Sequence, residues 1–214
     1  MFTISAAVVS SLFAVGNATA GFTGLQYEDV ENNMAGYTTW RIYAGTDGEV
    51  DAVYGDGAST LTVNSDTGFF NGIGTGATAT NNNDAFWASF PSNEFDSMVS
   101  IGMTHTNSGG SMSVIGIDFT DFDAGGDIES NNGSWYSTPD QPNVLAGAEG
   151  RVLLGQFTMY GLDSSVSGVL NLQGKEGDFE TFVAEDVFFY YPIPAPGALA
   201  LLGLAGLAAR RRRK

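Results

Sequence analysis

Hydrophobic residues in the middle of this chain recur in short runs that alternate with polar positions, and glycine, asparagine or aspartate separates one run from the next. Residues 166–173 are the clearest example, because Val166, Gly168, Leu170 and Leu172 share one face and face away from polar side chains. A period of two is typical of a strand with one buried face. No stretch sustains an apolar period of 3.6 residues for three turns, which disfavours long helices.

The pattern predicts strands at residues 37–44, 50–54, 60–64, 85–90, 98–104, 111–119, 151–160, 166–173 and 179–190. Turn residues at positions 47–48 and 56–57 separate the first three segments, so we expect these to form a three-stranded meander. The 29 glycines agree with many turns and short strands. We therefore predict an all-β fold, an antiparallel β-sandwich with jelly-roll-like topology, and keep a β-barrel as the alternative.

The first twenty residues have the organisation of a secretory signal peptide. An apolar run broken only by serine extends from Ile4 to Val15, and Ala18 and Ala20 then supply the small residues of a cleavage site before Gly21. About twelve apolar residues are too few for a comfortable membrane span. We predict a signal helix and cleavage between Ala20 and Gly21. No Lys or Arg precedes the run, and a buried core helix is the alternative.

Residues 192–214 consist of a proline-rich entry, an apolar run and a basic end. Prolines cannot continue a strand ladder, so they mark the end of the folded domain. The apolar run would reach about 20 Å as a helix, short of a bilayer core of about 30 Å. This indicates a marginal transmembrane helix whose arginines stay on the cytoplasmic side. The motif positions are Pro192, Pro194, Pro196, Gly197, Arg210, Arg211, Arg212 and Arg213.

This three-part end resembles the PEP-CTERM sorting signal of bacterial exopolysaccharide-associated proteins, although Pro194-Ala195-Pro196 stands where the family has Pro-Glu-Pro. The resemblance implies that a membrane protease of the exosortase type recognises the tail and removes or exchanges it. It further implies transient anchoring in the inner membrane, then delivery to the cell surface or the extracellular matrix, with exopolysaccharide or other matrix components as partners. An ordinary C-terminal anchor is the alternative.

The charge of the central region is strongly one-sided. Residues 21–191 contain only Arg41, Arg151 and Lys175 against 24 carboxylates, which gives a formal charge of 3 − 24 = −21. Such a domain is repelled by nucleic-acid phosphates and anionic lipid headgroups, so we exclude nucleic acid as a partner. The chain has no cysteine, so neither disulfides nor thiolate chemistry contribute.

An acidic, glycine-bearing loop at residues 118–129 is the candidate metal site. Asp121, Asp123, Asp127 and Glu129 could supply oxygen ligands to Ca²⁺. Counted from Asp121, the twelfth position holds Asn132 where an EF-hand has a bidentate Glu, and flanking helices are lacking. The sequence therefore predicts a looser surface calcium site or, as the alternative, a solvated acidic loop.

Trp135 and Tyr136 are the candidate glycan-binding residues, because exposed aromatic rings stack on sugars. The alternative is that they are core or cross-strand residues. His105 is the only histidine, and its polar surroundings indicate a structural or exposed role rather than a catalytic one. Paired carboxylates could hydrolyse glycosides, but 24 acids single out no pair. We therefore expect a protein without enzymatic activity.

The sequence thus predicts three parts: a signal peptide at residues 1–20, an acidic β-sandwich at 21–191 and a sorting signal at 192–214. The leading hypothesis is an exported structural or adhesive protein of the cell surface or extracellular matrix. A carbohydrate- or calcium-binding module on the same scaffold is the alternative, and a glycoside hydrolase is a distant third.

Overall fold

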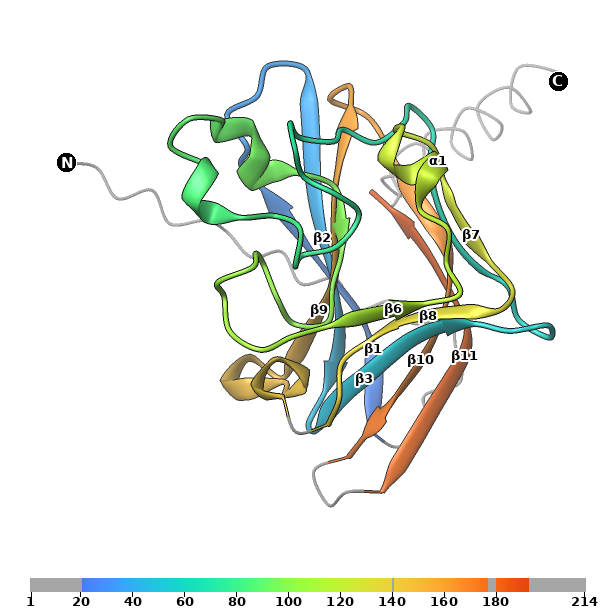
Figure 1. The fold of residues 1–214 in the computed structure, drawn as a ribbon. Coiled ribbons are helices and arrows are strands. Elements are labelled where there is room, and N and C mark those ends of the chain that lie inside the picture. Colours follow the sequence, from blue (N-terminus) through green and yellow to red (C-terminus); the bar gives the residue numbers. More distant parts are fainter. Residues whose placement is uncertain (1–20, 140, 177–179, 193–214) are drawn as a thin grey trace, which may run out of the picture.

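The computed structural model describes residues 21–139, 141–176 and 180–192, and these form a sandwich of two antiparallel sheets (Figure 1). The predicted all-β class and two-sheet architecture are therefore confirmed. The predicted signal helix and the apolar helix with its arginine cluster lie outside the described residues. Within the described parts of the chain, no helix is long and apolar enough to cross a membrane.

The smaller sheet has four strands in the order β1-β2-β9-β5. The larger sheet has seven, in the order β6-β8-β3-β10-β4-β7, with β11 paired to β10. The strands of the smaller sheet are β1 (Phe22–Val30), β2 (Tyr37–Thr46), β9 (Arg151–Tyr160) and β5 (Met98–Val99). Those of the larger sheet are β3 (Glu49–Gly55), β4 (Leu61–Ser65), β6 (Ser113–Ile115), β7 (Ile128–Ser130), β8 (Gly133–Tyr136), β10 (Val166–Lys175) and β11 (Thr181–Tyr191).

At two positions of the larger sheet, two short strands lie end to end in place of one long strand. β3 pairs with the second half of β10 and β4 with its first half, so both lie along the same edge of β10. β7 pairs with β4 and β8 pairs with β3, which repeats the interruption in the next strand outward. The predicted three-stranded meander is therefore wrong: β2 belongs to the other sheet, and β3 and β4 share an edge of β10 instead of pairing with each other.

The gap between β3 and β4 is filled by the side chain of Asn171 on β10, which is fully buried. Its Nδ2 donates to the carbonyls of Tyr54 at 2.9 Å and Ser59 at 3.0 Å. Its Oδ1 accepts from the Asp186 amide at 2.9 Å and lies 2.7 Å from the Ser59 hydroxyl. Both amide protons thus reach carbonyl acceptors and Oδ1 accepts a backbone amide, so the buried group has partners on both sides, as burial requires.

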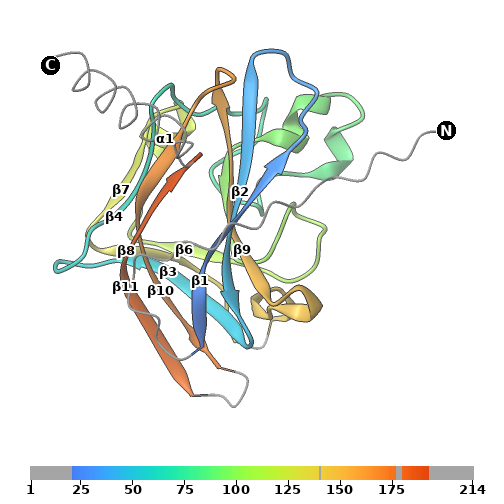
Figure 2. The same cartoon turned by 180° about the vertical axis from the view of Figure 1, so that it is seen from behind.

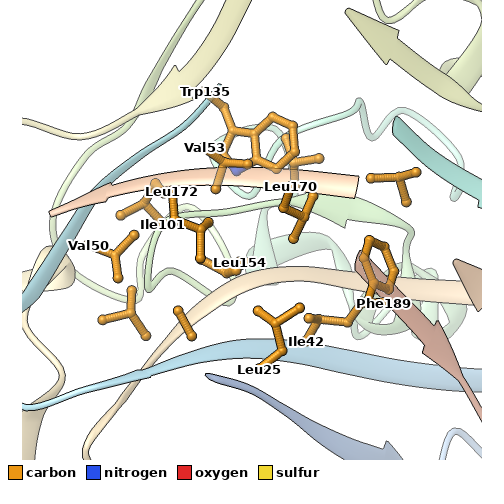
Figure 3. Packing of buried hydrophobic residues seen from close by; sticks show 14 of the residues in the cluster. Leu25, Ile42, Val50, Val53, Ile101, Trp135, Leu154, Leu170, Leu172 and Phe189 are labelled. Carbon is orange, nitrogen blue, oxygen red and sulfur yellow. The ribbon is translucent and has the colours of Figure 1, made fainter. Parts of the chain in front are cut away.

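Apolar side chains from both sheets meet between them in one core (Figure 3). Leu170 and Leu172 of β10 and Phe189 of β11 face Leu25 and Ile42 of the smaller sheet. The apolar face predicted for residues 166–173 is confirmed, because Val166, Leu170 and Leu172 are at most 2% exposed. Asn171, predicted on the polar face, is fully buried instead, because it fills the gap between β3 and β4.

The two sheets differ in what covers their outer faces. Segment 66–112 covers much of the outer face of the smaller sheet, where Thr39, Gln156 and Thr158 are fully buried and hydrogen-bonded. No segment that the structure describes covers the outer face of the larger sheet along β10 and β11, as seen from behind (Figure 2). Part of the larger sheet's outer face is therefore accessible to solvent.

Several short elements differ from the predicted strands. Residues 85–90 form part of η1 (Asp84–Phe86) and a turn before η2 (Pro91–Phe95), because Asn83 caps the first turn and Pro91 begins the second. Only Met98–Val99 and Ser113–Ile115 are strands within 98–104 and 111–119. β1, β7 and β8 were not predicted. The remaining helices are α1 (Thr120–Asp123), η3 (Pro142–Val144) and η4 (Gly147–Glu149).

Replacing Asn171 with Ala is expected to lower the free energy of unfolding by about 3 kcal/mol, because it leaves buried carbonyls and an amide without partners. Urea denaturation monitored by tryptophan fluorescence measures the change. Asn64→Ala on β4, a half-buried position of the same sheet, is the matched control, with an expected change within about 0.5 kcal/mol. Equal losses for the two variants would contradict the assigned role of Asn171.

Candidate functional site

The open side of the larger sheet carries a mixed aromatic and polar surface, which we call the outer aromatic face. Tyr190 of β11 lies opposite Ser167 of β10, which in turn lies opposite Asn64 of β4. The next row has the same order of strands, with Phe188, Val169 and Thr62. The outer aromatic face consists of Val183, Phe188, Tyr190, Ser167, Val169, Gln173, Thr62 and Asn64.

Two rings of this face are accessible to solvent. Phe188 is 56% exposed and Tyr190 is 40% exposed, while the intervening Phe189 is 1% exposed and points into the core. Alternation along β11 therefore places both rings on the same side, next to hydroxyl and amide side chains. Flat aromatic rings beside hydrogen-bonding groups are the arrangement that binds the faces and hydroxyls of sugars.

Sequence reasoning did not identify Phe188 and Tyr190 as surface residues. Residues 187–191 are all apolar or aromatic, so the run gives no polar partner that marks the solvent side. Alternation along a strand nevertheless places Phe188 and Tyr190 on the same face. If Phe189 had been known to be buried, both rings would have been predicted to face solvent. The missing information was which of the two faces is buried, and the packing of the two sheets decides that.

Carboxylates border the outer aromatic face near the gap between β3 and β4 that Asn171 fills. Tyr54 donates its hydroxyl to Glu185 Oε1 at 3.1 Å. Partial burial, this hydrogen bond and nearby acids raise the pKa of Tyr54 to about 12, so the phenol stays a neutral donor at physiological pH. The Asp186 carboxylate contacts the Ser59 hydroxyl. This border of the face therefore carries negative charge, and the hydroxyl groups of Tyr54 and Ser59 contact its carboxylates.

Trp135 does not belong to any accessible surface. It is 1% exposed, and its Nε1 donates to the Ser100 carbonyl at 3.1 Å. The prediction that Trp135 stacks on a glycan is wrong, because the ring lies on the inner side of β8 and packs in the core (Figure 3). Tyr136 follows it on the strand, so it points to the outer side, where it is half-buried opposite Ala52. Of the predicted pair, Tyr136 is therefore the residue that is partly accessible to solvent.

The four acids of the predicted calcium loop are distributed over α1, the segment after it and β7. Asp121 and Asp123 lie in the short helix α1, and Asp127 Oδ1 accepts the Ser65 amide at 3.0 Å. Glu129 is exposed on β7 opposite Thr62. Among the residues that the structure describes, no group of three or more Asp, Glu or His side chains is arranged to hold a metal ion. Calcium binding by this loop stays a prediction.

His105 takes part in a local network that fixes η1. Its Nε2 lies 3.7 Å from Asp84 Oδ2 and its Nδ1 lies 3.0 Å from the neighbouring Thr104 hydroxyl. The Trp87 ring packs edge-on against the imidazole at 5.0 Å between centroids. Asn107 donates to the other Asp84 oxygen. The contacts of Asp84 and Trp87 join η1 and its end to residues 105–107, as a structural histidine would.

A groove of about 470 Å³ lies beside Arg151 at one end of β9. The Arg151 guanidinium lies 3.1 Å from Glu28 and 2.8 Å from Glu149, and it stacks 3.8 Å over the Tyr43 ring. Tyr43 donates to the same Glu28 oxygen at 2.7 Å. The cation is thus neutralised by two carboxylates and a ring, which leaves little attraction for an anionic ligand.

Two buried carboxylates carry an oxygen without a hydrogen-bond partner. Asp96 is fully buried, its Oδ1 accepts the Gly72 amide at 2.6 Å, and its Oδ2 has no partner. Burial raises its pKa to about 7 although nearby donors lower it. Asp51 likewise has an unpartnered Oδ1, and burial followed by the charge of Glu49 raises its pKa to about 6.

Asp96→Asn is expected to flatten the pH dependence of stability. Folded Asp96 holds its proton more tightly than the unfolded residue, so its contribution is full below about pH 4 and is lost as the pH rises through about 7. Asn keeps the acceptor for Gly72 and cannot titrate. We expect the free energy of unfolding, measured by urea denaturation from pH 4 to 8, to depend less on pH in Asp96→Asn than in the wild type. The difference between the two slopes should reach about 1.4 kcal/mol per pH unit.

Asp47→Asn, at an exposed turn, is the control for the Asp96 experiment and should leave the slope unchanged. Parallel curves for the wild type and Asp96→Asn would show that Asp96 ionises normally in the folded state.

Comparison of the chain with protein-family models, with curated proteins and with solved structures finds no match. Function must therefore be inferred from the residues themselves. The outer aromatic face, the excess of carboxylates and the two terminal segments are the features that bear on it.

Proposed function

We propose that this chain is an exported structural or adhesive protein of the cell surface or extracellular matrix, without enzymatic activity, delivered by its C-terminal sorting signal. The observation that carries the proposal is the position of the strands relative to the two expected processing sites. β1 begins at Phe22, immediately after Gly21, and β11 ends at Tyr191, immediately before Pro192. Removal of both end segments would leave in place every strand that the structure describes.

The attachment of the last strand supports this role. Tyr191 stacks on Tyr27 of β1 at 4.6 Å between ring centroids and meets the edge of Trp40 of β2 at 4.2 Å. The end of the larger sheet is thereby fixed to the smaller sheet one residue before the tail begins. A protease of the exosortase type would therefore meet a tail that starts at a fixed point of the fold, and cutting the tail would not loosen the domain.

The charge of the domain supports the same proposal. A formal charge of −21 over residues 21–191 keeps copies of the domain apart and soluble outside the cell and attracts cations. In the described residues, His105, Asp84 and Thr104 serve the contacts of η1, and the Arg151 groove is internally neutralised. These arrangements favour binding and presentation over catalysis.

The intact mass of the protein recovered from the native cell surface and medium tests the proposal. We expect a species that begins at Gly21 and ends between Pro192 and Gly197, since both cuts fall outside the strands. A variant with glutamine at positions 210–213 is the control and should retain its tail, because stop-transfer and recognition need the positive charges. Wild-type protein that keeps residues 210–214 and occurs only in membranes would contradict delivery to the matrix.

We propose as a second candidate, compatible with the first, that the outer aromatic face binds polysaccharide. The observation that favours it is the pair of rings, Phe188 and Tyr190, which are 56% and 40% exposed and lie beside Ser167, Asn64 and Thr62. The rings offer apolar surface to the faces of sugar rings, and the neighbouring hydroxyl and amide groups can pair with sugar hydroxyls. The carboxylates around the face favour neutral over anionic polymers.

Loss of either ring is expected to weaken polysaccharide binding about tenfold, since one stacking contact of about 1.4 kcal/mol is removed. Affinity electrophoresis of Phe188→Ala and Tyr190→Ala in gels with hydroxyethyl cellulose or with polysaccharide from the producing cells measures the effect. Phe86→Ala is a matched control, because Phe86 is also 56% exposed but lies in η1. Unchanged mobility shifts for both β11 variants would remove the outer aromatic face as a glycan site.

A further inference from the structure

The chain contains two Asn-Gly pairs, Asn71-Gly72 and Asn132-Gly133. In such a pair the backbone nitrogen of the glycine can attack the side-chain carbonyl carbon of the asparagine. Glycine permits this approach best, because it has no β-carbon in the way and its backbone turns freely. The two pairs are equivalent in the sequence. Their surroundings in the fold differ, and these decide whether the nitrogen and the carbonyl carbon can meet.

Hydrogen bonds hold both residues of the first pair. The Gly72 amide donates to Asp96 Oδ1 at 2.6 Å, and Asp96 is fully buried. Asn71 is half-buried, and its Nδ2 donates to the Phe122 carbonyl at 2.7 Å. An attack by the Gly72 nitrogen would break both bonds and leave a buried carboxylate oxygen without its donor. Asn71 is therefore protected from this reaction in the folded chain.

The second pair lies in the connection of residues 131–132 between β7 and β8. Asn132 is exposed, and within the described part of the chain no hydrogen bond holds its side chain. Its backbone amide lies 3.4 Å from Ser130 Oγ, a long contact. Gly133 is the first residue of β8, and the ends of strands open more readily than the interior of a sheet. A local movement of this connection can therefore bring the Gly133 nitrogen to the Asn132 side chain.

Packing also requires the glycine of the second pair. A β-carbon on Gly133 would lie 2.7 Å from the Gly116 carbonyl carbon and 2.7 Å from Ile117 Cγ1, closer than side chains pack. A larger residue that slowed the reaction would therefore not fit at position 133. The exposed Asn132 is thus joined to a glycine that the fold cannot replace.

We propose that Asn132 is a site of spontaneous deamidation in the folded protein and that Asn71 is not. The Gly133 nitrogen gives its proton to a base in the solvent and bonds to Cγ of Asn132. The bond from Cγ to Nδ2 breaks, and ammonia leaves. Water then opens the resulting succinimide ring at one of its two carbonyl carbons, which gives aspartate or isoaspartate. The net change is the loss of ammonia and the gain of water, with no other reactant.

Each such event changes the charge and the backbone of this connection. The new carboxylate is ionised at physiological pH, so the already acidic domain gains a further negative charge close after Glu129 of β7. Isoaspartate also lengthens the main chain by one carbon, where the Asn132 carbonyl packs directly against Gly116. β7 and β8, which pair with β4 and β3, would have to adjust to the longer connection.

Timed incubation of the purified full chain in mildly alkaline buffer tests the proposal. Cleavage after glutamate places Asn132 in peptide 130–149 and Asn71 in peptide 50–94, and mass spectrometry with fragmentation locates each lost amide. We expect Asn132 to be converted at least about tenfold faster than Asn71, because two hydrogen bonds must break before Asn71 can react. Anion-exchange chromatography should separate the more acidic product from the starting protein.

The same incubation in concentrated urea is the control, because both pairs should then react at similar rates once the fold no longer distinguishes them. Asn132→Gln should keep its amide, since the longer side chain would have to form a larger ring. Asn132 that stays intact in the native protein while it reacts in urea would overturn the proposal. Equal rates at Asn132 and Asn71 in the native protein would overturn the protection of Asn71. Neither result depends on the proposed export.

Discussion

The side-chain amide of Asn171 is the interaction on which the larger sheet depends. It joins the end of β3, the start of β4 and the bulge of β11 through contacts with Tyr54, Ser59 and Asp186. Backbone pairing alone cannot close this gap, because β3 and β4 are both interrupted at the same level of β10. A fully satisfied amide is tolerated in the interior, whereas any partial set of these bonds would cost stability.

The contacts of Asn171 lie next to the surfaces that bear on function. β11 pairs with the opposite edge of β10 along its whole length, and Phe188 and Tyr190 project on one side of it while Phe189 packs on the other. The same edge contacts β1, through Phe22 with Phe182 and through Tyr27 with Tyr191. The first and last strands therefore hold each other, and both expected processing sites lie next to this contact. Gly21, Pro192 and the outer aromatic face thus all lie next to β11.

Local pattern identified the strands whose inner and outer positions are chemically distinct. β10 and β4 were predicted with their buried faces because apolar and polar positions alternate along most of their length. β9, which is buried on both faces, was predicted with its observed bounds. β7 and β8 have only three and four residues, too few for a period to register. Residues 85–90 contain aromatic side chains in a strand-like order, yet the Asn83 cap and Pro91 impose turns there. Capping and proline geometry outweighed β-propensity in that segment.

The sequence by itself determined the all-β class, the excess of 24 carboxylates over three cations in the central region, and the presence of distinct end segments. These follow from composition and short-range periodicity, which need no knowledge of partners. Only the tertiary structure decided that Trp135 is core and Phe188 is surface, and that Gly21 meets Glu176. Phe188 has apolar neighbours on both sides in the chain, and Gly21 and Glu176 are far apart in the sequence, so short-range pattern gives no signal at these positions. Which face is buried and which segments meet are therefore set by long-range packing of the two sheets.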